Sequence, residues 1–220
     1  MLVLVSGASA TLDRYADRPW LGSFVQPRNG IAPGVLEQRW HERGWPWACD
    51  NDAFNESFDH GRFVRMVNRL VGRPGLLWIA VPDVVGDCSG TAHLFLEHWH
   101  QLHCWERDGQ EHETPLAWVA QDGAEDHHLT EDCLGVADCV FLGGSTVWKE
   151  SRAAASIAAE AKDRGRLVHM GRVNTKRRLR IAFEMECDSV DGTGASMFPE
   201  VTLANFDRWL GTLTRQPALF

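Results

Sequence analysis

Short apolar runs recur along the whole chain, and each is closed by a turn or by a polar residue. Their β-branched content and nearly continuous apolar character are typical of strands buried on both faces of a parallel sheet. The runs cover residues 2–5, 22–25, 76–81, 116–120, 139–142, 167–170 and 189–190. We therefore expect each run to be a strand of one parallel sheet.

Stretches with helical periodicity lie between the later runs, over residues 89–104, 151–164, 175–184 and 203–213. A weaker pattern over residues 45–63 predicts one more strand end and one more helix. Seven or eight alternating strand and helix units predict an α/β fold, a (β/α)8 TIM-type barrel that is complete or else reduced and irregular. No repeat, low-complexity tract or linker divides the chain, so we expect a single domain over residues 1–220.

Composition and cysteine usage place the chain among ordinary globular proteins. Hydrophobic residues make up 44% and charged residues 24% of the sequence. The apolar start of the chain is short and lacks a basic region, so it predicts a first strand and not a signal peptide. No apolar run approaches the length of a membrane span. Six cysteines without a C-x-x-C pair predict free thiols, and hence a cytoplasmic location.

Charge is distributed unevenly. The formal net charge of −8 argues against general coating of nucleic acid, but residues 162–180 contain eight basic residues and one acid. This segment predicts a local anion-binding face, and a solvated helix face is the alternative. The side chains that we expect to contact a phosphate backbone are Arg172, Lys176, Arg177, Arg178 and Arg180.

Polar residues follow five of the predicted strands. Barrel enzymes build their active sites from the C-terminal ends of their strands. Any one of these segments can serve as a turn or a helix cap, but all five together predict a functional site at one mouth of the barrel. In chain order, the polar segments are Asp50-Asn51-Asp52-Ala53-Phe54, the segment around Asp83, Gln121-Asp122-Gly123, Gly143-Gly144-Ser145 and Asp191-Gly192.

Taken in order, these strand ends resemble the tRNA-guanine transglycosylase family, including the phage and bacterial members that place 7-deazaguanines in DNA. The family pattern also contains a glutamate after the paired glycines and ends on Asp-x-x-Asp, which correspond here to Glu150 and to Asp188-Ser189-Val190-Asp191. The resemblance covers roughly residues 45–195. It implies a barrel that breaks the bond between a base and its sugar in nucleic acid.

The resemblance assigns the two catalytic carboxylates. Asp191 corresponds to the nucleophile at the sugar C1′ atom, and Asp50 to the general acid/base. Two carboxyl groups in different environments suit a reaction in which the sugar gains positive charge and the base gains negative charge. Asp188 competes for the nucleophile's role, although strand alternation puts it on the opposite face from Asp191. The family pattern alone selects Asp191.

The resemblance also assigns base recognition. Asp83 and Gln121 would hydrogen-bond to the Watson–Crick edge of the base. Gly143 and Gly144 would offer backbone groups to an exocyclic oxygen, with Ser145 beside them. A base in a duplex must be flipped out to reach such a pocket. Trp45, Trp47, Trp118 or Trp148 could supply a stacking wall, but packing in the core or at the surface is the commoner role of tryptophan, and none of the four is selected.

Three departures from the family pattern modify these expectations. Asp52-Ala53 replaces the paired glycines that let the backbone approach the ligand. No cysteine follows Cys187, so the family's zinc site is missing, and little sequence remains for its tRNA-binding portion. We therefore expect a short relative without a metal or other cofactor, and DNA is favoured over tRNA as partner. The cluster His98, His100, His103 and Cys104 is interpreted as solvated rather than zinc-binding, because on a helix His98 lies far round from the face that the other three share.

These features predict an enzyme that exchanges a base of DNA or RNA for a free modified base, the co-substrate. One alternative is a DNA glycosylase that excises modified bases and leaves abasic sites, and a second is a non-catalytic base-binding module. No membrane partner is expected. The identity of the base, the choice between exchange and hydrolysis, and the oligomeric state stay open.

Overall fold

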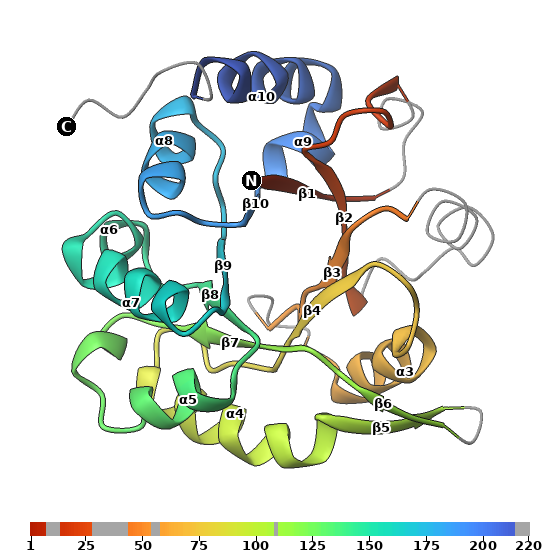
Figure 1. Cartoon of the computed structure of the whole chain (residues 1–220), viewed down its shortest axis with the longest axis vertical. Coiled ribbons are helices and arrows are strands. Elements are labelled where there is room, and N and C mark those ends of the chain that lie inside the picture. Colours follow the sequence, from red (N-terminus) through yellow and green to blue (C-terminus); the bar gives the residue numbers. More distant parts are fainter. Residues whose placement is uncertain (8–13, 28–43, 54–57, 108–109, 214–220) are drawn as a thin grey trace.

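The computed structural model describes residues 1–7, 14–27, 44–53, 58–107 and 110–213 (Figure 1). Eight parallel strands form a closed barrel in the order β1-β10-β9-β8-β7-β4-β3-β2, which confirms the predicted TIM-type barrel. The first and last barrel strands pair with each other and so close the sheet. The strands are β1 (Leu2–Ser6), β2 (Leu21–Val25), β3 (Trp47–Cys49), β4 (Leu76–Ala80), β7 (Leu116–Ala120), β8 (Cys139–Leu142), β9 (Leu167–Met170) and β10 (Ser189–Asp191).

Helices surround the barrel and connect its strands (Figure 1). Several begin at side chains that cap the first backbone N–H groups, among them Asp87, Ser151 and Thr175. The predicted helices over 89–104, 151–164, 175–184 and 203–213 begin and end no more than four residues from the ends of observed helices. The helices are α3 (His60–Leu70), α4 (Cys88–Leu102), α5 (Thr130–Val136), α6 (Thr146–Lys149), α7 (Arg152–Asp163), α8 (Lys176–Glu184), α9 (Thr193–Met197) and α10 (Pro199–Leu213).

An antiparallel hairpin interrupts the strand–helix alternation between α4 and β7. It consists of β5 (Cys104–Arg107) and β6 (Gln110–Glu113), which pair only with each other and stand outside the barrel. The sequence analysis missed it because residues 104–113 are polar and show no apolar run.

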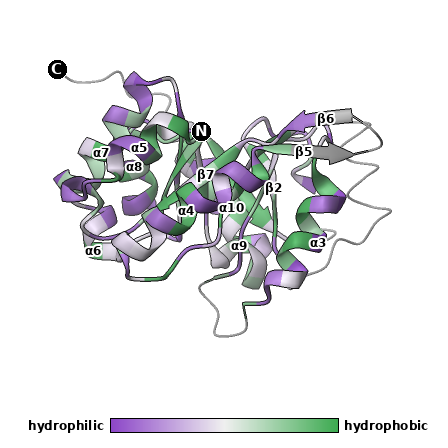
Figure 2. Ribbon diagram, turned by 90° about the horizontal axis from the view of Figure 1, so that it is seen from below, coloured by the Kyte–Doolittle hydropathy of each residue, from purple (hydrophilic) through white to green (hydrophobic). Residues whose placement is uncertain are grey.

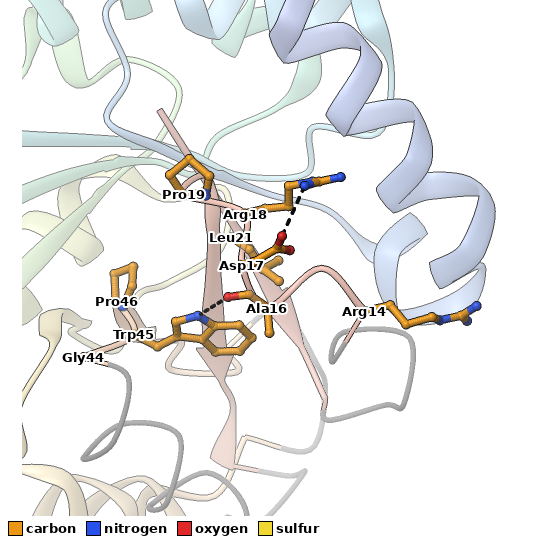
Figure 3. A pocket seen from close by; sticks show the side chains of 9 residues that line it. All are labelled: Arg14, Ala16, Asp17, Arg18, Pro19, Leu21, Gly44, Trp45 and Pro46. Carbon is orange, nitrogen blue, oxygen red and sulfur yellow. Dashed lines mark hydrogen bonds and ion pairs between the residues drawn. The ribbon is translucent and has the colours of Figure 1, made fainter.

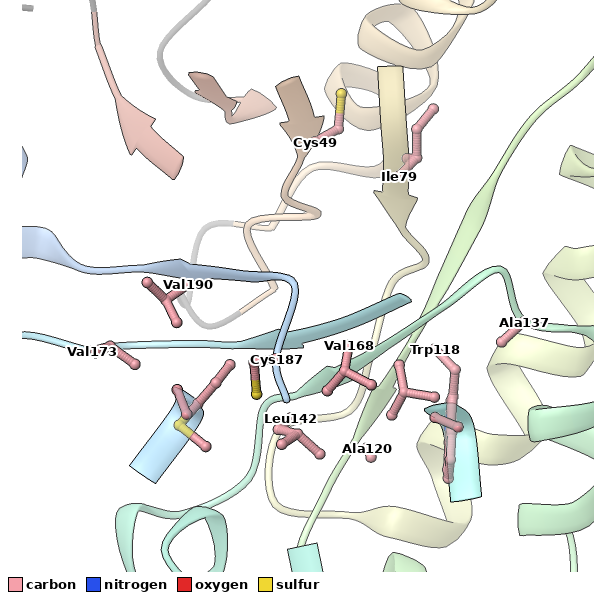
Figure 4. Close-up of a cluster of buried hydrophobic side chains, with 14 of the residues drawn as sticks. Cys49, Ile79, Trp118, Ala120, Ala137, Leu142, Val168, Val173, Cys187 and Val190 are labelled. Atoms are coloured by element: carbon pink, nitrogen blue, oxygen red, sulfur yellow. The ribbon is translucent and has the colours of Figure 1, made fainter. Parts of the chain in front are cut away.

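The core has an inner and an outer layer, because side chains alternate between the two faces of each strand. Leu4 and Trp78 belong to the inner cluster inside the barrel, whereas Val3 and Val5 belong to the outer cluster. In Figure 4, outward-facing residues such as Trp118 and Val168 lie in this outer cluster. Figure 2 shows the hydrophobic strands enclosed by helices whose exposed turns are hydrophilic.

The tryptophans proposed as a stacking wall all lie in the outer core. Trp45, Trp47, Trp118 and Trp148 are buried at exposed fractions of 6% or less. Their indoles therefore pack in the layer outside the barrel strands, and none of the four lines the cavity at the carboxyl ends of those strands. Within the described ranges, no helix has the length and apolar character needed to cross a bilayer.

Candidate active site

A cavity of about 360 Å³ opens where the carboxyl ends of the barrel strands meet. We call it the mouth cavity. Six of the predicted site residues line it together: Asp50, Asp83, Gln121, Gly143, Arg172 and Asp191. Gly144 and Ser145 follow Gly143 but do not line it. The other lining residues come mostly from the same strand ends. They are Phe24, Gln26, Asn51, Val85, Val119, Phe141, Gly171 and Thr193.

A larger cavity of about 730 Å³ lies beside the segments that lead into β2 and β3 (Figure 3). Leu21, Trp45 and Pro46 are among the residues that line it, and Trp45 donates to the carbonyl of Ala16 at 3.1 Å. This cavity is at the amino ends of the strands. Residues at that end of a TIM barrel usually contribute to stability, so we assign the candidate chemistry to the mouth cavity.

Asp191 ends β10 and is held from two sides through one oxygen. Its Oδ1 atom accepts from Nε2 of His169 at 3.2 Å and from the backbone N–H of Arg172 at 2.9 Å. Oδ2 has no hydrogen-bond partner in the described part of the chain. The carboxylate is therefore oriented by its first oxygen and can present the second to a ligand in the cavity.

His169 lies inside the barrel, at 0% exposure, directly behind Asp191. Burial lowers the pKa of His169, so its imidazole is neutral near pH 7. Nδ1 lies 2.8 Å from the hydroxyl of Ser189 on the adjacent strand. With Nδ1 accepting from that hydroxyl, Nε2 carries the proton and donates to Asp191. The sequence analysis placed His169 at a strand end but gave it no role, because only the barrel register brings it to Asp191.

Asp50 follows β3 and faces the same cavity. Its oxygens accept from the side chain of Gln26 and from the backbone N–H of Asn51, both at 3.0 Å. Burial raises the pKa of Asp50 to about 6, and the neighbouring carboxylates of Asp191 and Asp52 also raise it, against the hydrogen bond from Gln26. A carboxyl group with this pKa exchanges its proton near neutral pH.

Asp83 is held in a buried network of amides. Asn51 donates to Oδ1 of Asp83 at 2.8 Å, and Gln121 donates to Oδ2 at 2.6 Å. Asn51 also donates to the carbonyl of Val81 at 2.7 Å, and Oε1 of Gln121 accepts from Gly86 at 3.3 Å. Burial raises the pKa of Asp83, and its amide partners oppose that rise. The side chains of Asp83 and Gln121 are therefore both hydrogen-bonded within the chain, and they form one wall of the cavity.

Arg172 adopts a left-handed backbone conformation, with φ of 63°, just after β9. Its Nη2 atom donates to the carbonyls of Gly143 at 2.8 Å and of Gly144 at 2.6 Å. The preceding Gly171 is tightly enclosed, since a Cβ atom there would lie 2.6 Å from Cε2 of Phe141. The glycines after β8 and β9 thus allow two loops to approach closely, and Arg172 ties these loops together.

Lys149, at the end of α6, is a further charged residue beside the site that the sequence analysis missed. It is only 4% exposed, and its Nζ atom donates to the carbonyl of Gly171 at 2.7 Å. Burial lowers the pKa of Lys149 to about 7, and repulsion from Arg172 acts in the same direction. A lysine at a helix end usually predicts solvent exposure, so the sequence gave no signal for this position.

Asp188 lies away from the mouth cavity. It precedes β10, and its carboxylate accepts from Nζ of Lys162 at 2.9 Å and from the backbone of Val168 at 2.8 Å. The expected separation of Asp188 and Asp191 onto opposite faces agrees with these contacts. Asp188 fastens the start of β10 to β9, whereas Asp191 presents its carboxylate at the other end of the strand.

Three of the five basic residues expected to bind phosphate make ion pairs within the chain. Arg177 and Arg178 both pair with Glu150, and Arg180 pairs with Glu184 on the same helix. Such surface pairs are weak, but a phosphate would have to displace a carboxylate at each of them. Nucleic-acid contact at this surface stays a prediction. Over the described residues, no group of three or more His, Cys, Asp or Glu side chains is arranged to hold a metal ion.

Comparisons with known proteins define the fold class. Among solved structures, the chain is similar to an HpcH/HpaI aldolase from Desulfitobacterium hafniense DCB-2, at 12% identity and a TM-score of 0.53, over 100% of this chain and 95% of that one. A citrate lyase from Burkholderia xenovorans LB400 matches at 12% identity and a TM-score of 0.49, over 87% and 72% of the two chains. No family model and no curated protein matches. At such identities the likeness shows the barrel fold alone.

These findings contradict the predicted action on nucleic acid. The solved structure that the chain resembles at a TM-score of 0.53 is named as an aldolase, not as a transglycosylase or a glycosylase. Base exchange, base excision and passive base binding are therefore wrong as functions for this chain. The misleading signal has a physical origin, because Asp, Gln and Gly at strand ends also build the turns and loop contacts of the barrel mouth, as at Gly143 and Gly171.

Proposed function

We propose that this chain is an enzyme that breaks a carbon–carbon bond next to a carbonyl group of a small molecule, an aldol-type lyase. The observation that carries the proposal is the presence of two carboxyl groups with different environments, Asp191 and Asp50, on one mouth cavity. Such a pair can divide the roles of base and acid. The barrel shared with an aldolase supports the same class of reaction.

Asp191 acts as the base. Its Oδ1 atom is fixed by His169 and by the backbone of Arg172, which leaves Oδ2 for the substrate. Both partners donate hydrogen bonds to Oδ1, so the orientation of the carboxylate is set before a substrate binds. It takes the proton of the substrate's hydroxyl group, which is on the β-carbon relative to the carbonyl group.

Asp50 acts as the acid. Its pKa of about 6 keeps a fraction of the group protonated near neutral pH. A general acid works best when its pKa is close to the operating pH. The nearby carboxylate of Asp191 is one cause of the raised pKa, so it helps Asp50 to keep its proton.

The steps balance for a neutral β-hydroxy carbonyl substrate. Asp191 removes the hydroxyl proton, and the electron pair of that O–H bond forms a new carbonyl group. The carbon–carbon bond breaks, and its electron pair forms the double bond of an enol. The original carbonyl oxygen takes the proton of Asp50. The products are an aldehyde or ketone and an enol, and solvent then returns the proton from Asp191 to Asp50.

The lining of the mouth cavity defines the substrate further. Its volume of about 360 Å³ suits a small molecule and is at the low end of the usual range for ligand pockets. Phe24 and Phe141 provide apolar walls. Among the described lining residues, three aspartates face one arginine, so we expect a neutral substrate rather than an anionic one.

Proton exchange tests the proposal without requiring the natural substrate. The protein is incubated in D2O with a series of small β-hydroxy ketones and with the ketones that they would release. NMR then follows deuterium incorporation at the carbon next to the carbonyl and the appearance of aldehyde. We expect exchange with at least one compound of the series.

Matched variants identify the groups responsible. Asp50→Asn and Asp191→Asn should each slow exchange by a factor of about 10² to 10⁴, the usual range for a general acid or base. Asp188→Asn is the control, because Asp188 lies outside the mouth cavity and should leave exchange unchanged when the variant is folded. Exchange that persists in both site variants, or is absent with every compound, would contradict the proposal.

A further inference from the structure

We propose that Lys149 is a positioning residue that orients Asp191 through the peptide group between Gly171 and Arg172. The relay itself is a property of the fold. Its effect on catalysis rests on the proposed function, in which Asp191 is the base. No substrate contact is assigned to Lys149, since it does not line the mouth cavity.

The relay consists of two hydrogen bonds at opposite ends of one peptide plane. Nζ of Lys149 donates to the carbonyl oxygen of Gly171 at 2.7 Å. The N–H group of the same peptide, that of Arg172, donates to Oδ1 of Asp191 at 2.9 Å. Because a peptide group is planar, fixing its oxygen fixes the direction of its N–H bond. A cation at the oxygen also polarises the group and strengthens the hydrogen bond that the N–H donates.

The position of Lys149 is costly, which argues against a merely incidental contact. A buried ammonium group without an anionic partner loses much solvation free energy. Lys149 makes no salt bridge in the part of the chain that the structure describes, and the Gly171 carbonyl is its hydrogen-bond partner there. The charged and titratable groups that face it are Arg172, Asp191, Arg178, Asp122 and His169. Only the aspartates among them favour its charge, and Asp191 is the aspartate that the relay reaches.

The relay also stabilises the uncommon backbone conformation of Arg172. A non-glycine residue with φ of 63° is held in an uncommon conformation that its surroundings must stabilise. The orientation of the Gly171–Arg172 peptide follows from this conformation. Lys149 at its oxygen and Asp191 at its N–H stabilise that orientation from both ends. Removing Lys149 takes away the hydrogen bond at the oxygen of this peptide, so the N–H group that Asp191 accepts from is held less firmly than the imidazole of His169.

NMR can measure the relay directly. We compare the amide proton shift of Arg172 and the side-chain carboxyl ¹³C shift of Asp191 in the natural protein, in Lys149→Met and in Lys162→Met. Lys162 is the matched control, because it pairs with Asp188 beyond the amino end of β10. The Arg172 amide proton should move upfield in Lys149→Met, where its hydrogen bond weakens, and stay in place in Lys162→Met.

A titration provides a second measurement that does not need the Lys149 variant to fold. In Asp50→Asn, the nearby carboxyl group that titrates at about 6 is removed. The Arg172 amide shift should then change with an inflection at about pH 7, where Lys149 releases its proton. Unchanged Arg172 and Asp191 shifts in folded Lys149→Met, or a flat titration in Asp50→Asn, would overturn the relay.

Kinetics separate the relay from the proposed reaction. If the aldol-type activity exists, Lys149→Met should lower kcat by a factor of about 10 to 10² with KM unchanged, because misplacement of the base affects the chemical step. If the NMR shifts move as expected while no compound is turned over, the relay stands and the proposed function fails. If turnover is found but kcat in folded Lys149→Met equals that of the natural protein, the positioning role is wrong.

Discussion

Replacing Asp50 with asparagine should stabilise the folded protein above pH 6. Burial raises the pKa of Asp50 from 3.8 to about 6, which means that the fold disfavours its ionised form. One pKa unit corresponds to about 1.4 kcal/mol, so the shift is equivalent to about 3 kcal/mol. Asparagine is neutral at every pH and avoids this cost. The half-buried position and the altered hydrogen bond with Gln26 reduce the expected gain to about 1 to 2 kcal/mol.

The sign of the pH dependence follows from proton binding. Between pH 3.8 and about 6 the folded protein holds the Asp50 proton more tightly than the unfolded chain does. The contribution of Asp50 to the free energy of unfolding therefore falls as the pH rises through this window. It is constant above the window, where both states are ionised, and also below it, where both are protonated. The difference in stability between Asp50→Asn and the natural protein should grow from pH 4 to pH 6 and then level off.

Urea unfolding at one-unit intervals from pH 4 to pH 8 measures this difference, provided that the m-values of the two proteins agree. Asp17→Asn is the matched control, because the Asp17 side chain is 75% exposed, so its substitution should produce no comparable rise over the same window. A difference between Asp50→Asn and the natural protein that is independent of pH, or that shrinks toward pH 6, would refute the reasoning. It would mean that Asp50 is not desolvated as its surroundings indicate.

Three further predictions concern the same site. Deuterium exchange by the natural protein should decline as the pH rises above about 6, since Asp50 loses the proton that it donates, and a pH–rate profile that rises there would contradict its role as the acid. His169→Phe should lower kcat by a factor of about 10 with KM unchanged, because the donor behind the base is lost while the aromatic packing is kept; steady-state kinetics check this. Gly171→Ala should destabilise the fold by about 1 to 3 kcal/mol, since its Cβ atom would lie 2.6 Å from a ring atom of Phe141. Gly135→Ala is the control, because Gly135 has open space around it and its substitution should not destabilise the fold. Urea unfolding compares the two variants.

The barrel could be predicted from sequence because each strand is a nearly continuous apolar run between polar turns. The run at 139–142 coincides with β8, and those at 116–120 and 167–170 coincide with β7 and β9. The meeting of Asp50, Asp83 and Asp191 at one mouth followed from the same reasoning, since the carboxyl ends of parallel barrel strands lie together. The hairpin at 104–113 could not be found this way, because it lacks an apolar run.

The roles of His169 and Lys149 could not be predicted, because each depends on distances across the barrel. His169 reaches Asp191 through the pairing of β9 with β10, and Lys149 reaches Gly171 through the turn after β8. The functional prediction failed for a related reason. Short motifs of aspartate, glutamine and glycine at strand ends reflect the geometry of a barrel mouth as much as its chemistry, so their order alone did not identify the reaction.

The pairing of β1 with β10 determines when the site can form during synthesis. Leu4 lies in register with Asp191, so the strand that carries Asp191 pairs with a strand that is made much earlier in translation. At about 5 to 20 residues per second, a ribosome needs roughly 10 to 40 s to add the residues between them. During that time one edge of β1 waits without its partner strand. The mouth cavity is therefore completed only after β10 has been made, and a nascent chain without β10 lacks the Asp191 wall of that cavity.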